Sequence, residues 1–308
     1  MSQPKWTASD IPDQTGRVAV ITGANSGIGF ESAKALAAKG ATLVMACRNL
    51  DKASRARSEI KKEVPEARLE VIQLDLANLA SVRTFADAFR ARYERLDLLI
   101  NNAGVMVPPY TKTKDGFELQ FGANHLGHFA LTGHLMEQVL ATPGSRVVNV
   151  SSGAHRMGSM DFENLQAEKG YKPWRAYGRS KLANLLFTLE LQNRFEAARA
   201  GALALAAHPG GTKTNLQSHM SGVLRPLLNL IMQEQAMGAL PTLYAATAPD
   251  VSGNDYYGPG GFQEIRGYPV KVDSSDASQD VGVARQLWAE SEKLTGVRYE
   301  ALEPASVN

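Results

Sequence analysis

The sequence predicts a single-domain α/β protein in which a doubly wound parallel sheet of about seven strands is covered by helices on both faces. Short apolar runs alternate with longer segments of helical periodicity. The alternation continues without interruption to residue 207, and no internal repeat is present. Hydrophobic residues make up 44% and charged residues 21% of the 308, which is ordinary for a globular chain that can bury a core. We therefore expect one domain over residues 1–308.

The first elements expected are two strands, each followed by a helix. Residues 17–22 (RVAVIT) form a short apolar run closed by glycines, which is typical of a buried strand. Helical periodicity follows over about 28–39, and Gly40 is suited to end that helix. Residues 42–47 (TLVMAC) predict the second strand, and the charged segment 51–64 predicts the second helix.

The same alternation continues through the middle of the chain. Residues 69–74 (LEVIQL) predict a third strand, and Asn78 is suited to cap a helix over 79–93. Residues 96–100 (LDLLI) predict a fourth strand, and a long helix is expected over roughly 117–140.

The pattern is regular up to the sixth strand and loosens after residue 210. The fifth and sixth strands are expected at 146–150 (RVVNV) and 202–207 (ALALAA), with a helix over about 174–199 between them. The remaining elements expected are helices joined by a loop over 215–249, a segment rich in glycine, proline and aromatic residues over 253–267, and a last helix over 278–294.

Charge and cysteine content exclude several classes of protein. Lysine and arginine number 33 against 31 acidic residues, so the net charge of +2 does not predict nucleic-acid binding. Cys47 is the one cysteine, which excludes an internal disulfide and a CxxC zinc site and favours a reducing compartment. The N-terminus has no signal-peptide pattern, and no apolar run reaches the ~18–20 residues of a membrane span. We expect a cytoplasmic protein without an integral membrane segment.

The turn after the first strand, TGANSGIG (22–29), has the features of a pyrophosphate site. Glycines allow a tight turn and close approach of the backbone, and a helix N-terminus offers free N–H groups, as in a Rossmann-like fold. The spacing is GxxxGxG rather than GxGxxG, and an ordinary strand-to-helix turn is the alternative. The candidate binding residues are Gly23, Asn25, Ser26, Gly27, Ile28 and Gly29.

The ends of the second and third strands bear on which dinucleotide is bound. Arg48 follows the second strand, and no acidic residue occurs before Asp51. An arginine there accommodates the 2′-phosphate of NADP, whereas an acid would hold the ribose of NAD, so we expect NADP(H). A surface role for Arg48 is the alternative. Asp75, followed by Leu76, ends the third strand, where its carboxylate could accept from the adenine amino group or cap a helix.

A reactive cluster is expected around YGRSK (177–181). Tyr177 and Lys181 are four residues apart on a predicted helix and share one face. A neighbouring ammonium lowers the pKa of a phenol and makes it a better acid or base near neutral pH. Ser151 and Ser152 end the fifth strand, at the edge where such sheets bind ligands, and a serine hydroxyl there can donate to a substrate oxygen.

With these motifs in place, the chain resembles the short-chain dehydrogenase/reductase family over nearly its whole length. The matching motifs are TGANSGIG (22–29), NNAG (101–104), ANHLGHF around Asn124, VVNVSS (147–152), YGRSK (177–181) and HPGGTKT (208–214). Within the family it is most similar to the branch of retinol dehydrogenases, the WW-domain oxidoreductase and protochlorophyllide reductases. That similarity rests on ACRN (46–49), the interval from Ser152 to Tyr177, SKLANLLF (180–187) and GPGGFQEIRGYP (258–269).

The resemblance implies roles for the matching residues. Tyr177 would be the proton donor in reduction or the base in oxidation, Lys181 would lower its pKa and hold the nicotinamide ribose, and Ser152 would polarise the carbonyl. Asn124 would fix a water near Lys181, and Ser151 would be a structural neighbour. Further cofactor contacts are implied for Asn102, Ala103 and Gly104 on the adenosine side and for Pro209, Gly210 and Thr212 on the nicotinamide side.

Two departures from that branch bear on the substrate. Retinol dehydrogenases often have an N-terminal hydrophobic anchor, which is absent from this sequence and suggests a soluble relative. Protochlorophyllide reductases use a reactive cysteine near the substrate, whereas Cys47 lies on the second predicted strand.

Other features allow more than one interpretation. His125, His128 and His134 on one predicted helix are expected to pack rather than bind metal, and His155 and His208 flank the predicted site. The apolar segment 216–232 could pack on the core, cover an apolar substrate or contact a membrane surface. The wider region 211–270 is expected to form a lid over the substrate. Tyr256, Tyr257, Phe262 and Tyr268 could close the pocket from the other side. The two long helices at 117–140 and 174–199 could form a homo-oligomer.

The sequence thus predicts an NADP(H)-dependent oxidoreductase that interconverts a carbonyl and an alcohol on a small, fairly apolar molecule. A non-catalytic dinucleotide-binding sensor or scaffold is the alternative, because a fold does not by itself imply a reaction. The sensor would not need Ser152, Tyr177 and Lys181 together.

Overall fold

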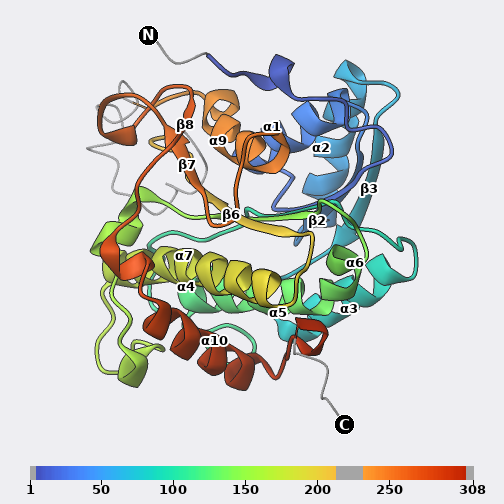
Figure 1. The fold of residues 1–308 in the computed structure, drawn as a ribbon. Coiled ribbons are helices and arrows are strands. Elements are labelled where there is room, and N and C mark those ends of the chain that lie inside the picture. The colour runs from blue at the N-terminus through green and yellow to red at the C-terminus, as the bar shows by residue number, and fades with distance from the viewer. Residues whose placement is uncertain (1–4, 213–231, 303–308) are drawn as a thin grey trace.

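A computed structural model describes residues 5–212 and 232–302 and contains one eight-stranded sheet (Figure 1). The strand order is β3-β2-β1-β4-β5-β6-β7-β8, and neighbours are parallel except β7 and β8. The strands are β1 (Val18–Thr22), β2 (Thr42–Cys47), β3 (Arg68–Gln73), β4 (Leu98–Asn101), β5 (Arg146–Val150), β6 (Leu203–Ala207), β7 (Tyr256–Pro259) and β8 (Pro269–Lys271). The predicted doubly wound α/β fold is confirmed, with eight strands rather than about seven.

The two strands after residue 250 were not located by the sequence pattern. β7 and β8 have four and three residues and lie in a segment rich in glycine and proline, so neither produces an apolar run. Pro269 begins β8 and has no N–H to donate, which suits the edge of a sheet. The antiparallel pair ends the sheet on one side.

Helices cover both faces of the sheet (Figure 1). The larger ones are α1 (Gly27–Ala38), α2 (Leu50–Glu63), α3 (Leu79–Arg90), α5 (Gly127–His134), α7 (Pro173–Ala197), α9 (Gln235–Thr247) and α10 (Val281–Thr295). One apolar core lies between the sheet and α1, α2 and α9, and a second lies between the sheet and α3, α5, α7 and α10. Asn78 caps α3 by accepting from the Ala80 N–H at 3.2 Å, as predicted.

The helix expected over 117–140 is broken into several pieces. It consists of α4 (Leu119–Phe121), a π-helical turn (Gly122–Leu126), α5 and α6 (Met136–Leu140). The backbone leaves helical values at Leu135 (φ −104°, ψ 6°), between α5 and α6. Gly122 and Gly127 keep right-handed helical values, and Gly127 packs closely, because a Cβ there would lie 2.4 Å from the Leu76 carbonyl oxygen. Wider turns of this kind often occur at functional sites, and this one contains Asn124.

The later part of the chain is only partly described. α9 confirms a helix within the predicted 215–249 segment, and α10 confirms the last helix. Apart from Met232, the apolar segment 216–232 lies outside the described residues. Across 5–212 and 232–302, no helix has both the length and the apolar character required to cross a bilayer.

Candidate active site

The candidate site forms at the carboxyl edge of the sheet. The glycine turn follows β1, the NNAG segment follows β4, Ser151 and Ser152 follow β5, and the 209–212 turn follows β6. These four strands are consecutive in the sheet, so segments far apart in the sequence meet at one edge. Ligands bind at this edge of open α/β sheets, where the strand order reverses around β1 and β4.

The glycine turn is shaped to let a ligand approach its backbone. Gly23 and Gly27 have φ of +69° and +59°, in the left-handed region that favours glycine. A Cβ on Gly29 would lie 2.5 Å from the Gly23 carbonyl oxygen and 2.6 Å from Asn102 Nδ2. The Ser26 hydroxyl does not cap α1. The first N–H groups of α1 therefore have no cap from the Ser26 side chain, which suits a pyrophosphate.

The NNAG segment is tied to the end of β1. Thr22 Oγ1 accepts from the Asn102 and Ala103 N–H groups at 2.9 Å, and Asn102 Nδ2 donates to the Thr22 carbonyl at 2.8 Å. Gly104 lies beside the reactive cluster, because a Cβ there would lie 3.2 Å from Asn124 Oδ1 and 3.7 Å from Lys181 Nζ. The Asn102 side chain thus holds the turn in place, which the sequence alone did not indicate.

Arg48 and Asp75 lie at neighbouring strand ends. Arg48 is exposed, and Asn49 next to it caps α2 by accepting from the Lys52 N–H at 2.8 Å. Asp75 Oδ1 accepts from the Ala77 N–H at 3.0 Å and so stabilises the turn before α3. The helix cap considered for Asp75 is supplied by Asn78 instead.

Tyr177, Lys181 and Ser152 converge in the structure. Tyr177 and Lys181 are 5% and 3% exposed on α7, and Lys181 Nζ lies 5.8 Å from the centre of the Tyr177 ring. Lys181 Nζ donates to the Val150 carbonyl at 3.0 Å. The Ser152 side chain, at the end of β5, lies close enough to the Tyr177 phenol to lower its pKa. A phenol, an ammonium and a hydroxyl thus lie together at the carboxyl edge of the sheet.

Burial shifts the pKa of both ionisable groups in the cluster. Burial raises the pKa of Tyr177 to about 12, although the nearby Ser152 side chain acts in the opposite direction. Burial also lowers the pKa of Lys181 to about 8. In the ligand-free chain, the cost of burying charge therefore outweighs the lowering of the phenol pKa expected from the lysine.

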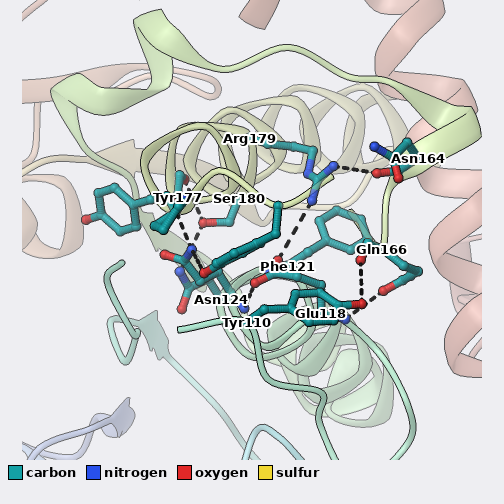
Figure 2. Close-up of polar contacts among 12 residues, drawn as sticks. Tyr110, Glu118, Phe121, Asn124, Asn164, Gln166, Tyr177, Arg179 and Ser180 are labelled. Carbon is teal, nitrogen blue, oxygen red and sulfur yellow. Dashed lines mark hydrogen bonds and ion pairs between the residues drawn. The ribbon is translucent and has the colours of Figure 1, made fainter. Parts of the chain in front are cut away.

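Asn124 links the π-helical turn to two other parts of the site (Figure 2). Its Nδ2 donates to the Val105 carbonyl and to Ser180 Oγ, each at 3.0 Å, and its Oδ1 accepts from the Val105 N–H at 2.8 Å. Ser180 Oγ in turn donates to the Tyr177 carbonyl at 2.8 Å. Asn124 therefore connects the segment after NNAG to the helix that holds the phenol and the ammonium.

A buried ion pair lies behind this connection (Figure 2). Arg179 Nη2 is 3.8 Å from Glu118 Oε2, and the Glu118 side chain is fully buried. The Glu118 carboxylate also accepts from the N–H groups of Gln120 and Phe121 at 2.8 and 2.9 Å. The sequence analysis missed Glu118 and Arg179, because neither residue belongs to a spacing that indicates a pair.

Several flanking residues have structural contacts. Ser151 Oγ donates to the Lys181 carbonyl at 2.8 Å, as suits a structural neighbour. His155 Nδ1 is 2.7 Å from the Ser152 carbonyl oxygen, and its Nε2 accepts from the Ser275 N–H at 3.1 Å. The Ser152 backbone is therefore held by a buried imidazole.

Two of the three histidines on the broken helix, His125 and His128, are buried, and His134 is half-buried. His125 Nε2 contacts Ser291 Oγ at 2.8 Å, and His128 Nε2 contacts Thr22 Oγ1 at 2.9 Å. Burial lowers the pKa of His125 to about 3 and of His128 to about 4. Both rings are neutral packing groups near neutral pH.

The aromatic residues near β7 do not all face the site. Tyr256 lies against the rings of His155 and His208, with centroid distances of 5.7 and 5.1 Å. Tyr257 belongs to the core on the opposite face, where its hydroxyl donates to Asp255, so it does not close a pocket. Phe262 is 80% exposed.

Comparisons with known sequences agree with this geometry. A sequence profile of the short chain dehydrogenase family matches residues 17–222. Mouse (Mus musculus) retinol dehydrogenase 12 is 41% identical over 289 residues, covering 92% of this chain and 88% of the relative. Human (Homo sapiens) retinol dehydrogenase 13 is 40% identical over 294 residues, covering 92% and 85%.

Solved structures with the same fold include one that is similar over nearly the whole chain. An uncharacterised protein from Mycobacterium paratuberculosis is 43% identical, with a TM-score of 0.81 and coverage of 96% of this chain and 99% of its own. A short chain dehydrogenase from Shigella flexneri, complexed with NADP, is 23% identical, with a TM-score of 0.65 and coverage of 80% and 97%. At that identity, the second likeness concerns the fold alone.

Proposed function

Because the chain belongs to the short-chain dehydrogenase family and is an alcohol/carbonyl oxidoreductase, we propose that it uses NADP(H) and acts on a small, fairly apolar substrate. Tyr177 is the proposed acid and base. The observation that carries this proposal is the convergence of Ser152, Tyr177 and Lys181 at the sheet edge beside the uncapped N-terminus of α1.

The residues at the sheet edge fit a dinucleotide. When bound, the nicotinamide ring exchanges a hydride with the substrate carbon. The Gly23–Gly29 turn would hold the pyrophosphate, and the exposed Arg48 guanidinium would pair with a 2′-phosphate. The 209–212 turn would lie on the nicotinamide side. Asp75 and Leu76 would lie beside the adenine, and Asn102, Ala103 and Gly104 beside the adenosine.

The side chains of the protein transfer the proton and stabilise the negative charge that develops on the substrate oxygen. In reduction, the Tyr177 phenol gives its proton to the substrate oxygen, and in oxidation the phenolate takes that proton back. The Ser152 hydroxyl donates a hydrogen bond to the same oxygen and polarises the carbonyl. The Lys181 ammonium stabilises the phenolate that remains and would also hold the nicotinamide ribose. Asn124 would fix a water near that ammonium.

An apolar substrate is supported by side chains near the reactive cluster. Trp174 is 47% exposed, and its ring lies 6.4 Å from that of Tyr177. Met157 is 57% exposed in the turn that follows Ser152. The relatives at about 40% identity are named for retinol, an apolar alcohol. We further propose that 1–308 is one domain in which 211–270 covers the substrate.

The test is NADPH oxidation with a panel of aldehydes and ketones that includes all-trans-retinal. Tyr177→Phe should lower kcat/KM at least 100-fold, because general acid catalysis is typically worth 10²–10⁴. The Kd for NADPH should stay within about threefold, since substitution removes only one hydroxyl. Tyr110→Phe is the matched control, as it removes a hydroxyl from a 41% exposed tyrosine outside the cluster. Turnover of Tyr177→Phe within about tenfold of the parent would show that the acid is another group.

A further inference from the structure

The turn between β7 and β8 holds an unusual backbone conformation. Gln263 and Glu264 have φ of +48° and +56°, two successive non-glycine residues in the left-handed region. Such residues are energetically costly and persist where surrounding contacts hold them. In this conformation, the Glu264 side chain contacts two other segments of the protein.

Glu264 contacts two segments of the candidate site at once. Its Oε2 lies 2.9 Å from His208 Nε2, and its Oε1 lies 3.5 Å from an Arg156 guanidinium nitrogen. Arg156 belongs to the turn that begins after Ser152, whereas His208 directly follows β6 and precedes the 209–212 turn. His208 and Arg156 both lower the pKa of Glu264, so the carboxylate is ionised near neutral pH.

The contact with His208 extends to the backbone of the 209–212 turn. His208 Nδ1 accepts from the Gly210 N–H at 3.3 Å, and the other ring nitrogen, Nε2, is the one beside the Glu264 carboxylate, without hydrogen-bond geometry. The neighbouring Ile265 carbonyl accepts from the Gly211 N–H at 2.8 Å. A Cβ on Gly210 would lie 2.5 Å from that carbonyl oxygen and 2.7 Å from the Glu264 carbonyl oxygen. The β7–β8 turn therefore lies directly against the Gly210 backbone.

We propose that Glu264 is a positioning residue that joins the Ser152 turn to the 209–212 turn and so sets the distance between the substrate oxygen and the nicotinamide. This inference rests on the proposed function, in which these two turns hold the two reactants. Transfer of a hydride tolerates little displacement, and a misplacement of about 1 Å can cost about 10²-fold in rate. Glu264 acts through His208 and Arg156 and need not touch either reactant.

The experiment compares Glu264→Ala and Glu264→Gln with the parent. The alanine variant should lower kcat at least tenfold while KM for the carbonyl substrate stays within about twofold. The primary isotope effect on kcat with 4-deuterated NADPH should rise, because a misplaced hydride makes transfer rate-limiting. The glutamine side chain has the same length and keeps an oxygen beside His208, so Glu264→Gln should recover most of kcat. Glu168→Gln, which alters an exposed ion pair with Lys112, is the control.

The outcomes separate this proposal from the proposed function. If the parent enzyme turns over the panel and Glu264→Ala matches the Glu168→Gln control, the positioning role is wrong while the function stands. A fall in kcat without a larger isotope effect and without recovery in the glutamine variant would indicate general structural damage and would also overturn it. If the alanine variant does not fold, His208→Asn supplies the test. Its shorter side chain would remove the contact between residue 208 and the Glu264 carboxylate and should reproduce the loss of kcat and the larger isotope effect.

Discussion

At the scale of single residues, Lys181 combines a functional role with a cost to stability. Its ammonium is 3% exposed and donates to the Val150 carbonyl, which also accepts from Asn184 Nδ2 at 3.1 Å. Burial lowers its pKa from 10.5 to about 8. Between these two pH values, the folded chain therefore binds fewer protons than the unfolded chain. Below about pH 8 the buried ammonium lowers the free energy of unfolding, and this loss is relieved as the pH rises from about 8 to 10.5.

We predict that Lys181→Met stabilises the ligand-free chain and abolishes turnover. The apolar side chain removes the buried charge, and Asn184 still satisfies the Val150 carbonyl. The gain should be about 1–3 kcal/mol near pH 7, seen as a rise in Tm of roughly 2–6 °C by calorimetry. It should shrink as the pH approaches 10. Lys61→Met, at an exposed position of α2, is the control, and a lower Tm for Lys181→Met alone would contradict the argument.

We propose that the charge of Arg48 sets the cofactor preference. Arg48→Asp should lower the ratio of kcat/KM with NADPH to that with NADH by about 10²-fold or more, because a carboxylate repels a 2′-phosphate and accepts from ribose hydroxyls. Arg55→Asp makes the same charge change at an exposed position of α2 and should leave the ratio nearly unaltered. An equal change in both variants would assign the effect to net charge and not to a contact of Arg48.

At the scale of elements, the Arg179–Glu118 pair fixes α7 against α4. Glu118 is fully buried, and burial raises its pKa while Arg179 lowers it. Removing one partner of a buried ion pair leaves an uncompensated charge, which typically costs 3–5 kcal/mol. The pair joins α7, which holds Tyr177, to the start of α4, which leads into the π-helical turn that holds Asn124, so its loss should loosen both elements (Figure 2).

We predict that Arg179→Met lowers the free energy of unfolding by about 3 kcal/mol at pH 7. Without the guanidinium, the pKa of Glu118 rises further above its unfolded value, so protonation should restore part of the loss as the pH falls toward 5. Urea unfolding at pH 5, 6 and 7 measures this. The double variant Arg179→Met/Glu118→Gln should lose less at pH 7 than the single variant. If the loss in the double variant equalled the sum of the losses in the two single variants, the two residues would not be coupled.

At the scale of the whole molecule, α10 completes the fold by covering α7. Residues 176–192 of α7 are buried without interruption, because the sheet, α4 and α10 surround them. Trp288 on α10 is 2% exposed and lies 5.1 Å from Phe129, 5.8 Å from Phe187 and 4.5 Å from Tyr299, measured between ring centres. The chain's own last helix thus covers part of α7, one of the two long helices considered from the sequence for subunit pairing.

We predict that Trp288→Ala destabilises the whole protein by about 3–5 kcal/mol, because the cavity it leaves lies between α5, α7 and the C-terminal segment. Trp174→Ala, at a residue 47% exposed, should change the free energy of unfolding by less than about 1 kcal/mol. Chemical denaturation followed by circular dichroism measures both. A Trp288→Ala loss as small as that of Trp174→Ala would mean that α10 contributes little to the core.

The sequence by itself determined the alternation of strands and helices, the glycine turn and the YGRSK motif. These are local signals, since apolar period, helix capping and four-residue spacing involve neighbours in the chain. Even the location of Ser152 at a strand end followed from the apolar run before it.

Only the tertiary structure decided which residues from distant parts of the chain come into contact. It also decided in which direction the pKa values of the buried groups shift. Three features depend on contacts between remote segments: the contacts of Glu264 with Arg156 and His208, the pairing of Arg179 with Glu118, and the close packing of Gly127 against Leu76. The pKa values of Tyr177 and Lys181 likewise depend on how much solvent the folded chain removes from them. No pattern within one segment encodes such burial, because it is produced by the packing of all the others.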